Sequence, residues 1–341
     1  MNPFEKRELG KTGINVTPLG FGAAQLGELY RTVSEDEAQQ AIAAAYEAGV
    51  TFWDTSPWYG LGLSEHRIGH YLRQRTRDSF TLQTKVGRVM SRPPDLANVD
   101  TDPWAGGLPF VYRFDYSYDA IMRSYEDSLM RLGLNRVDLL LIHDLDHEEH
   151  GSEQAVSRYM KQLSDGGGFK ALDGLRSAGE IKGIGAGINQ AHMIRRILNE
   201  FEMDVFLVAM PYSLLDQSPL EKELAICTQR NIGIVKGAPY ASGVLATGSV
   251  SDSKFNYEKA PGHVMEKVRA IETVCKRHTV PLRAAALQFL LGHESIATVI
   301  PGPTSKAEVL DNIEMMSVSI ANEFWADLKG EGLLQENAPT P

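Results

Sequence analysis

The chain has 341 residues, with 34 basic and 44 acidic side chains that give a formal net charge of −10. This acidic balance argues against a nucleic-acid partner, which usually requires a basic face, and no apolar run reaches the ~20 residues that cross a bilayer. Cys227 and Cys275 are too few for a disulfide scaffold or a metal cluster, and the charged N-terminus lacks the apolar stretch of a signal peptide, so we expect a cytoplasmic protein without a metal or a membrane partner.

The predicted elements begin with a short β-hairpin over residues 7–20, with its turn at 11–13. Ser34 and Glu37 have the spacing of a capping box at the start of the first helix, and Gly133 is placed to end the third. The expected strands are 20–22, 51–55, 80–86, 137–143, 181–188, 204–210, 232–237 and 296–300. The expected helices are 34–48, 64–75, 118–132, 169–178, 191–201, 218–230, 262–278, 281–292 and 305–316, with a further one at 320–333.

Eight strands, most of them followed by a helix, predict a parallel sheet that closes into an α/β (β/α)8 TIM barrel. We expect one domain over residues 1–341, with the N-terminal hairpin and an extra C-terminal helix outside the barrel. Three segments without clear periodicity, 88–117, 144–168 and 239–261, each follow a strand. We interpret them as the walls and lid of a pocket. Disordered insertions are the alternative interpretation, above all for 144–168.

Four polar side chains fall at or just beyond the C-terminal ends of predicted strands, the face of such a barrel where catalysis occurs. They are Asp54, Tyr59, Lys85 and His143. A phenol has a pKa of ~10, and a nearby ammonium from Lys85 would lower that pKa. Asp54 would hold Lys85 in place, and His143 would orient an alcohol or carbonyl oxygen. Each residue alone has an ordinary packing or ion-pair explanation, but together they indicate proton transfer beside a hydride-carrying cofactor.

Ordered motifs along nearly the whole chain resemble the aldo-keto reductase superfamily. They are LGKTG at 9–13, LGFG at 19–22, DTSPWYG at 54–60, SE at 64–65, TK at 84–85, LLLIH at 139–143, GEIKGIG at 179–185 and VIPG at 299–302. The resemblance implies the (β/α)8 barrel and a catalytic tetrad of Asp54, Tyr59, Lys85 and His143, with Tyr59 as general acid or base. Residues 21–30 and 59–65 are more closely similar to bacterial L-fucose or D-threo-aldose 1-dehydrogenases, and to pyridoxal 4-dehydrogenase and plant L-galactose dehydrogenase.

No G-x-G-x-x-G fingerprint follows a strand, so the sequence does not predict a Rossmann-type dinucleotide site. The resemblance instead implies a nicotinamide dinucleotide across the ends of the last strands. Many NADPH-using members carry Lys at the position of Gly302 and Arg at that of Glu308. Because cations and hydroxyls recognise a 2′-phosphate, these differences favour NAD over NADP. The implied cofactor-binding residues are Gly22, Asp54, Asn189, Pro239, Ser242, Gly243, Leu245, Gly302, Thr304, Ser305, Glu308, Asp311 and Asn312.

The function that this resemblance implies is oxidation of the anomeric carbon of an aldose to a lactone by an NAD-dependent dehydrogenase. The aldose would be of the L-fucose, L-galactose or D-arabinose type. Alternatives are an NAD(P)H-dependent reductase of aldehydes, a pyridoxal 4-dehydrogenase, or a non-catalytic subunit such as the potassium-channel β subunits that resemble this superfamily. The partner would be a small sugar or aldehyde, in a pocket that includes Trp58, Trp104 and Asp144, with Phe110 and Tyr112 as further candidates.

Overall fold

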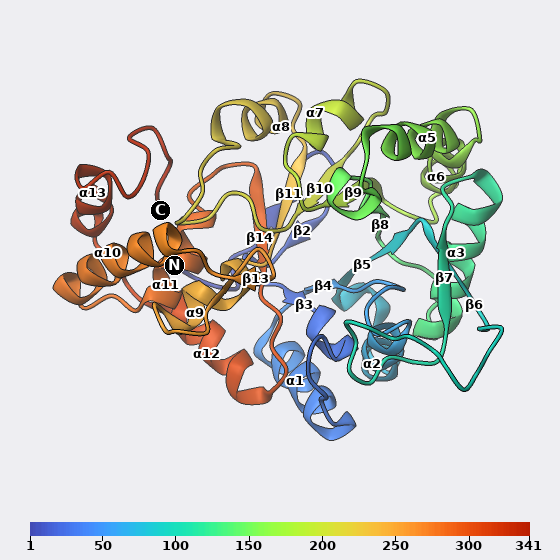
Figure 1. Cartoon of the computed structure of the whole chain (residues 1–341), viewed down its shortest axis with the longest axis horizontal. Coiled ribbons are helices and arrows are strands. Elements are labelled where there is room, and N and C mark those ends of the chain that lie inside the picture. Colours follow the sequence, from blue (N-terminus) through green and yellow to red (C-terminus); the bar gives the residue numbers. More distant parts are fainter.

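The computed structural model describes all 341 residues and contains a closed barrel of eight parallel strands (Figure 1). Each strand is hydrogen-bonded to the next in the order in which the strands are given below. Main-chain bonds from Gly20 N to Val299 O (2.9 Å) and from Gly22 N to Pro301 O (2.9 Å) join the first strand to the last, so the predicted barrel is confirmed. The strands are β3 (Phe21–Gly22), β4 (Phe52–Asp54), β5 (Thr81–Val86), β8 (Leu139–His143), β9 (Gly183–Ile188), β10 (Val205–Val208), β11 (Gly233–Gly237) and β14 (Ile296–Ile300).

Helices surround the barrel (Figure 1). Ser34 Oγ accepts a hydrogen bond from Glu37 N (3.3 Å) and Glu37 Oε2 accepts one from Ser34 N (3.1 Å), so the predicted capping box is present. Gly133 ends the third long helix with a φ of 62°. No helix combines the length and the apolar character needed to cross a membrane. The helices that follow the strands are α1 (Glu35–Ala48), α2 (Leu63–Leu72), α3 (Tyr118–Leu132), α6 (Gly168–Ser177), α7 (Met193–Leu198), α8 (Ala225–Gln229), α10 (Gly262–His278), α11 (Leu282–Leu290) and α12 (Lys306–Ser317).

The N-terminal hairpin packs against one end of the barrel. It consists of β1 (Arg7–Glu8) and β2 (Asn15–Val16), paired antiparallel. Leu9, Ile14 and Val16 are buried in one apolar cluster with residues of the barrel strands, among them Leu139 and Val205. These strand residues lie near the N-terminal ends of β8 and β10, so the hairpin covers the end of the barrel opposite His143.

The three long segments contain regular structure that the sequence interpretation did not include. Residues 88–117 hold an antiparallel pair, β6 (Arg88–Ser91) and β7 (Val111–Phe114). Residues 144–168 hold two helices, α4 (His147–His150) and α5 (Glu153–Ser164), so the disordered alternative is wrong. Residues 239–261 hold the short helix α9 (Val244–Thr247) and a hairpin of β12 (Lys254–Phe255) and β13 (Glu258–Lys259).

The last helix, α13 (Asn322–Gly330), lies outside the barrel, as predicted. Its Phe324 and Trp325 are buried, and the Trp325 ring lies 6.3 Å from that of Phe289 on α11. His278 Nε2 at the end of α10 is 2.7 Å from Asp327 Oδ2. The helix thus adds an outer layer on α10 and α11 and does not approach the ends of the strands that carry the polar residues.

Candidate active site

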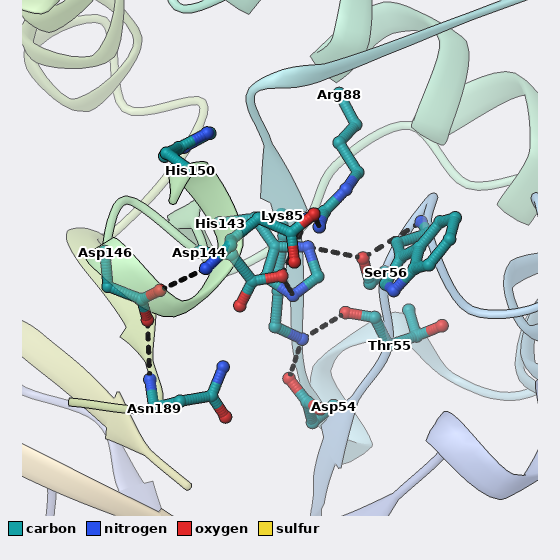
Figure 2. Close-up of polar contacts among 12 residues, drawn as sticks. Asp54, Thr55, Ser56, Lys85, Arg88, His143, Asp144, Asp146, His150 and Asn189 are labelled. Carbon is teal, nitrogen blue, oxygen red and sulfur yellow. Dashed lines mark hydrogen bonds and ion pairs between the residues drawn. The ribbon is translucent and has the colours of Figure 1, made fainter. Parts of the chain in front are cut away.

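Three barrel strands and one loop bring Asp54, Tyr59, Lys85 and His143 together. Figure 2 shows three of them, Asp54, Lys85 and His143. Asp54 and His143 are the last residues of β4 and β8, Lys85 is the last but one of β5, and Tyr59 follows in the loop before α2. Lys85 Nζ lies 4.6 Å from the centre of the Tyr59 ring, and that ring lies 5.9 Å from the ring of His143. The four residues predicted from the sequence therefore form one cluster at the C-terminal face of the barrel.

Asp54 and Lys85 form a buried ion pair. The distance from Lys85 Nζ to Asp54 Oδ1 is 2.7 Å, and Nζ also donates to the carbonyl oxygen of Thr55 at 2.8 Å. Gln83 Nε2 donates to the same Asp54 oxygen at 2.6 Å. Burial raises the pKa of the Asp54 carboxyl, while the attraction of Lys85 and these hydrogen bonds oppose that rise. The pair holds Lys85 against the Tyr59 ring, as expected.

The Tyr59 hydroxyl ionises less readily than a free phenol. Burial raises its pKa well above the ordinary value, and the negative charges of Asp54 and Asp144 raise it further, whereas Arg88 lowers it. The expectation that Lys85 would leave Tyr59 with a lowered pKa is therefore wrong for this structure. The physical reason is that burial and the negative charges of Asp54 and Asp144 outweigh the stabilisation that nearby cations give to the phenolate.

His143 is a neutral imidazole in a fixed orientation. Ser56 Oγ accepts a hydrogen bond from Trp58 N (3.1 Å) and lies 3.0 Å from His143 Nδ1. Asp144 Oδ2, an acceptor when the carboxyl is ionised, lies 3.3 Å from His143 Nε2, so the imidazole proton is assigned to Nε2 and the Ser56 hydroxyl donates to Nδ1. Burial, together with the positive charges of Arg88 and Lys85, lowers the pKa of His143 well below its ordinary value. The ring can thus donate a hydrogen bond from Nε2.

A second buried ion pair lies directly beside the first (Figure 2). Arg88 Nη1 is 2.7 Å from Asp144 Oδ2, and Arg88 Nη2 is 3.0 Å from Glu149 Oε1. Asp144 Oδ2 is also 3.3 Å from His143 Nε2. Burial raises the pKa of Asp144 to about 6 in spite of Arg88. The sequence interpretation did not single out Arg88, although an arginine three residues beyond Lys85 falls on the same face of the barrel.

Two adjoining cavities open at this cluster. One, of about 340 Å³, lies between β3, β11 and β14 and the loop after β11, and Gly22, Gly237, Gly243 and Gly302 are among its lining residues. The other, of about 290 Å³, is lined by Lys85, His143 and Asp144 together with Trp58 and Trp104. Tyr59 and Tyr257 line both cavities. Tyr59 therefore stands where two ligands in neighbouring cavities would meet.

Comparison with known proteins decides the family. A model described as the aldo/keto reductase family matches residues 18–330. This chain is an aldo/keto reductase. It is 38% identical to pyridoxal 4-dehydrogenase from Microbacterium luteolum (97% of this chain and 98% of that one) and 34% identical to D-threo-aldose 1-dehydrogenase from a Pseudomonas species (96% and 97%). It is 28% identical to L-galactose dehydrogenase from Arabidopsis thaliana (96% and 94%). These are the groups that the sequence motifs indicated.

A solved structure supports the same fold. An aldo-keto reductase from Bacillus halodurans, in its holo form, matches with a TM-score of 0.74 and 23% identity over 97% of both chains. At that identity the match shows a shared (β/α)8 barrel.

Six of the thirteen residues expected to bind the cofactor line the larger cavity of this aldo/keto reductase, Asn189 lines the smaller one, and the other six line neither. Those that line the larger cavity are Gly22, Asp54, Pro239, Ser242, Gly243 and Gly302. Asn189 lines the smaller cavity instead, and its N–H donates to Asp146 Oδ2 at 3.0 Å. Leu245 is fully buried in α9 and does not line the larger cavity. Asp311 is engaged by Arg283 (2.8 Å), and Asn312 Oδ1 accepts from the Tyr240 hydroxyl at 2.6 Å.

Glu308 has partners that the sequence interpretation missed. Its Oε2 accepts hydrogen bonds from Thr304 N (2.7 Å) and Thr304 Oγ1 (3.0 Å) at the start of α12, where Ser305 caps the helix. Arg31 approaches from the loop after β3, with Nη2 3.6 Å from Glu308 Oε1. A positive charge thus faces Glu308 across the joint between the first strand, β3, and the last strand, β14. It was missed because residues 31 and 308 are far apart in the sequence.

The predicted substrate-pocket residues are only partly brought together. Trp58, Trp104 and Asp144 line the smaller cavity. Tyr112 lies behind Trp58, with ring centres 4.7 Å apart, and Phe110 is 38% exposed and lines neither cavity, so their assignment as lining was wrong. The segment 88–117 pairs with itself as a hairpin, which turns Tyr112 toward Arg88 instead of the cavity.

Proposed function

We propose that this chain is an NAD-dependent dehydrogenase that oxidises the anomeric carbon of an aldose to a lactone. The observation that carries the proposal is the cluster of Asp54, Tyr59, Lys85 and His143 at the junction of two cavities. The larger cavity would hold the dinucleotide and the smaller one the sugar. The relatives named D-threo-aldose 1-dehydrogenase and L-galactose dehydrogenase support this substrate class.

The lining and backbone of the larger cavity support a dinucleotide as its ligand. The cavity volume of about 340 Å³ is in the range of ligand sites, and small residues along it let a ligand approach the main chain closely. The loop after β11 is held in left-handed backbone at Ala238, Ala241, Ser242 and Gly243, with φ between 45° and 105°. A nicotinamide bound there would accept the hydride that leaves the anomeric carbon.

The protein's own residues would manage the proton and the oxygen. The Nε2–H of neutral His143 would donate to the oxygen of the reacting carbon and hold it beside Tyr59. The Tyr59 phenolate would accept the proton of that hydroxyl group as general base. Lys85 would stabilise the phenolate, while Asp54 fixes the ammonium in place. Closely packed groups around the cluster would exclude water from it.

The test is turnover by the purified protein. A set of aldoses and pyridoxal is offered with NAD+ and with NADP+, and the reduced nicotinamide is followed by its absorbance. We expect aldose oxidation, faster with NAD+, and a loss of ~10²–10⁴-fold in kcat in Tyr59→Phe, the range for general acid–base catalysis. Binding of NADH, followed by fluorescence, should stay close to wild type in this variant. A Tyr59→Phe enzyme that keeps more than about a tenth of kcat would contradict the role of Tyr59.

Two other activities have specific support. Oxidation of pyridoxal is favoured by the 38% identity to pyridoxal 4-dehydrogenase. Reduction of an aldehyde is favoured by the protonation state of Tyr59, since a phenol whose pKa lies well above neutral pH carries the proton that reduction requires. The same set of substrates, supplemented with aldehydes and NADH or NADPH, ranks the three activities by kcat/KM.

A further inference from the structure

Asp144 lies in an unusual position for a carboxylate. It directly follows His143, has left-handed backbone with a φ of 51°, and its N–H donates to Gly187 O at 2.8 Å. Only 9% of the residue is exposed, and that part faces the smaller cavity. The backbone therefore turns at this residue in a way that brings a negative charge to the wall of the substrate cavity.

Arg88 fixes the Asp144 side chain. The guanidinium is 1% exposed, and its carbon lies 5.0 Å, 5.2 Å and 4.6 Å from the ring centres of Trp58, Tyr112 and Phe114. With its plane against aromatic rings and its Nη1 on Asp144 Oδ2 at 2.7 Å, Arg88 has little freedom to move. Asp144 Oδ1 has no hydrogen-bond or ion-pair partner in the protein. A rigidly held carboxylate with a free oxygen at a cavity wall is suited to accept a hydrogen bond from a ligand.

The distance from Asp144 to His143 defines what it would recognise. Asp144 Oδ2, on the same carboxylate as the free Oδ1, lies 3.3 Å from His143 Nε2. This is the nitrogen that would hold the reacting oxygen under the proposed function, on which this inference rests. Two oxygens on neighbouring carbons of a polyol are separated by about one hydrogen-bond length. We propose that Asp144, positioned by Arg88, is a specificity residue that accepts a hydrogen bond from the substrate hydroxyl on the carbon next to the reacting carbon.

The surroundings favour a neutral hydroxyl over an anionic group. Asp144, Glu148 and Glu149 line the smaller cavity, and Lys85, which is paired with Asp54, is the Lys or Arg side chain among its lining residues, with Arg88 behind the wall. An ionised carboxylate accepts hydrogen bonds and donates none, so its ligand must be a donor. The substrate class that fits is therefore an uncharged 2-hydroxy aldehyde, or the cyclic hemiacetal of one.

The experiment compares each substrate with its deoxy analogue in two enzymes. In wild type, kcat/KM for an aldose should exceed that for the 2-deoxy aldose by ~10–100-fold, the range for a hydrogen bond to a charged group. In Asp144→Asn that ratio should fall to a few-fold at most. Asparagine keeps the size of the side chain and tolerates the left-handed backbone, so the variant is matched in shape. Thermal unfolding of the variant checks that the fold is retained.

A second variant separates recognition from an indirect effect through Arg88. Glu149→Gln removes the other carboxylate on Arg88 but leaves Asp144. Because Glu149 also lines the cavity, this variant should change kcat/KM for the aldose and the 2-deoxy aldose alike and leave their ratio at the wild-type value. The proposal is overturned if the wild-type ratio is close to one, a result that needs no variant. It is equally overturned if Asp144→Asn keeps the wild-type ratio.

A reductive pair of substrates distinguishes this inference from the proposed function. Glyceraldehyde has a hydroxyl on the carbon next to its carbonyl carbon and propionaldehyde has none. Their reduction can be measured even if the enzyme oxidises no aldose. If aldoses are not oxidised but glyceraldehyde is preferred in wild type and not in Asp144→Asn, the proposed function is wrong and the role of Asp144 stands. If aldoses are oxidised with equal ratios in both enzymes, the proposed function stands and the role of Asp144 is wrong. Turnover of neither pair overturns both.

Discussion

Tyr59 shows how strongly a single site depends on charge balance. Its hydroxyl is buried, and both this burial and the neighbouring carboxylates raise its pKa. The nearby ammonium of Lys85 is paired with Asp54. A group with a raised pKa stays protonated at neutral pH. Under the proposed mechanism this state serves carbonyl reduction but limits alcohol oxidation, because oxidation needs the phenolate.

The first prediction is a pH dependence of opposite sign in the two directions. We expect kcat/KM for oxidation to rise from neutral to alkaline pH as Tyr59 ionises, and kcat/KM for reduction to fall over the same range. Lys85→Met should lose most activity and shift the remaining oxidation profile to higher pH, because the phenolate loses its neighbouring cation. Initial rates across the pH range measure both effects. An oxidation rate that is flat with pH in wild type would contradict this role of Tyr59.

At the scale of elements, the sequence predicted the barrel well and its insertions poorly. Continuous apolar strands such as 139–143 and the cap at Ser34 are local signals, and they lie where expected. Helix α5 also left a signal, since Ser152 caps it and Val156, Met160 and Leu163 are buried at helical spacing, but its polar composition obscured that pattern. The β6–β7 hairpin joins strands separated by a long loop, which no short-range pattern indicates.

The candidate site divides in the same way. The predicted cluster of Asp54, Tyr59, Lys85 and His143 is brought together because each side chain comes from or follows a strand of one barrel. Arg88 and Arg31 were missed because their importance depends on partners across the fold, Asp144 and Glu308. The pKa of Tyr59 could not be derived from neighbouring residue types, since burial is its largest cause.

The second prediction concerns the N-terminus of α12. Glu308 should favour NAD+ over NADP+ by at least ~10-fold in kcat/KM, because its carboxylate repels a 2′-phosphate and pairs with Arg31. Glu308→Gln keeps an acceptor for Thr304 and frees the guanidinium, so it should raise kcat/KM for NADP+ and change that for NAD+ little. The double variant with Arg31→Ala should lose this gain.

The matched comparison is the pair of Glu308→Gln enzymes with and without Arg31. Equal use of both dinucleotides by wild type, or a gain that survives removal of Arg31, would contradict this account. Lys at position 302 is a less clean test, because a Cβ there would lie 2.9 Å from Gln25 Cγ.

At the scale of the whole molecule, the net charge is −10, and acidic side chains are also in excess around the smaller cavity. Its lining includes Asp144, Glu148 and Glu149, while the charge of Lys85 is paired with that of Asp54.

The third prediction is that phosphorylated substrates are poor. Pyridoxal 5′-phosphate and aldose phosphates should show at least ~10-fold lower kcat/KM than their unphosphorylated forms. Glu148→Gln and high salt should each reduce this difference in kcat/KM between phosphorylated and unphosphorylated substrates. Equal rates for both forms would show that these carboxylates do not repel the ligand.

The fourth prediction follows from the place of the larger cavity in the barrel. It lies on the seam where β3 meets β14, with Gly22 on one side and Ile300 and Gly302 on the other. A dinucleotide there would bind only the closed barrel and so stabilise the seam. Amide hydrogen exchange at Gly20, Gly22 and Val299 should slow when NAD+ is added. The amides of α13, remote from the cavity, are the internal control, and equal slowing in both places would contradict the prediction.

The same seam has a consequence for the order of events during synthesis. The main chain of residues 18–22 can pair with residues 299–301 only after almost the entire polypeptide has left the ribosome. Until then β3 remains an open edge, which is the part of a sheet most prone to pair with another chain. A dinucleotide that binds the closed barrel would therefore favour this last step of folding, and its concentration would influence what share of newly made chains reaches the folded state.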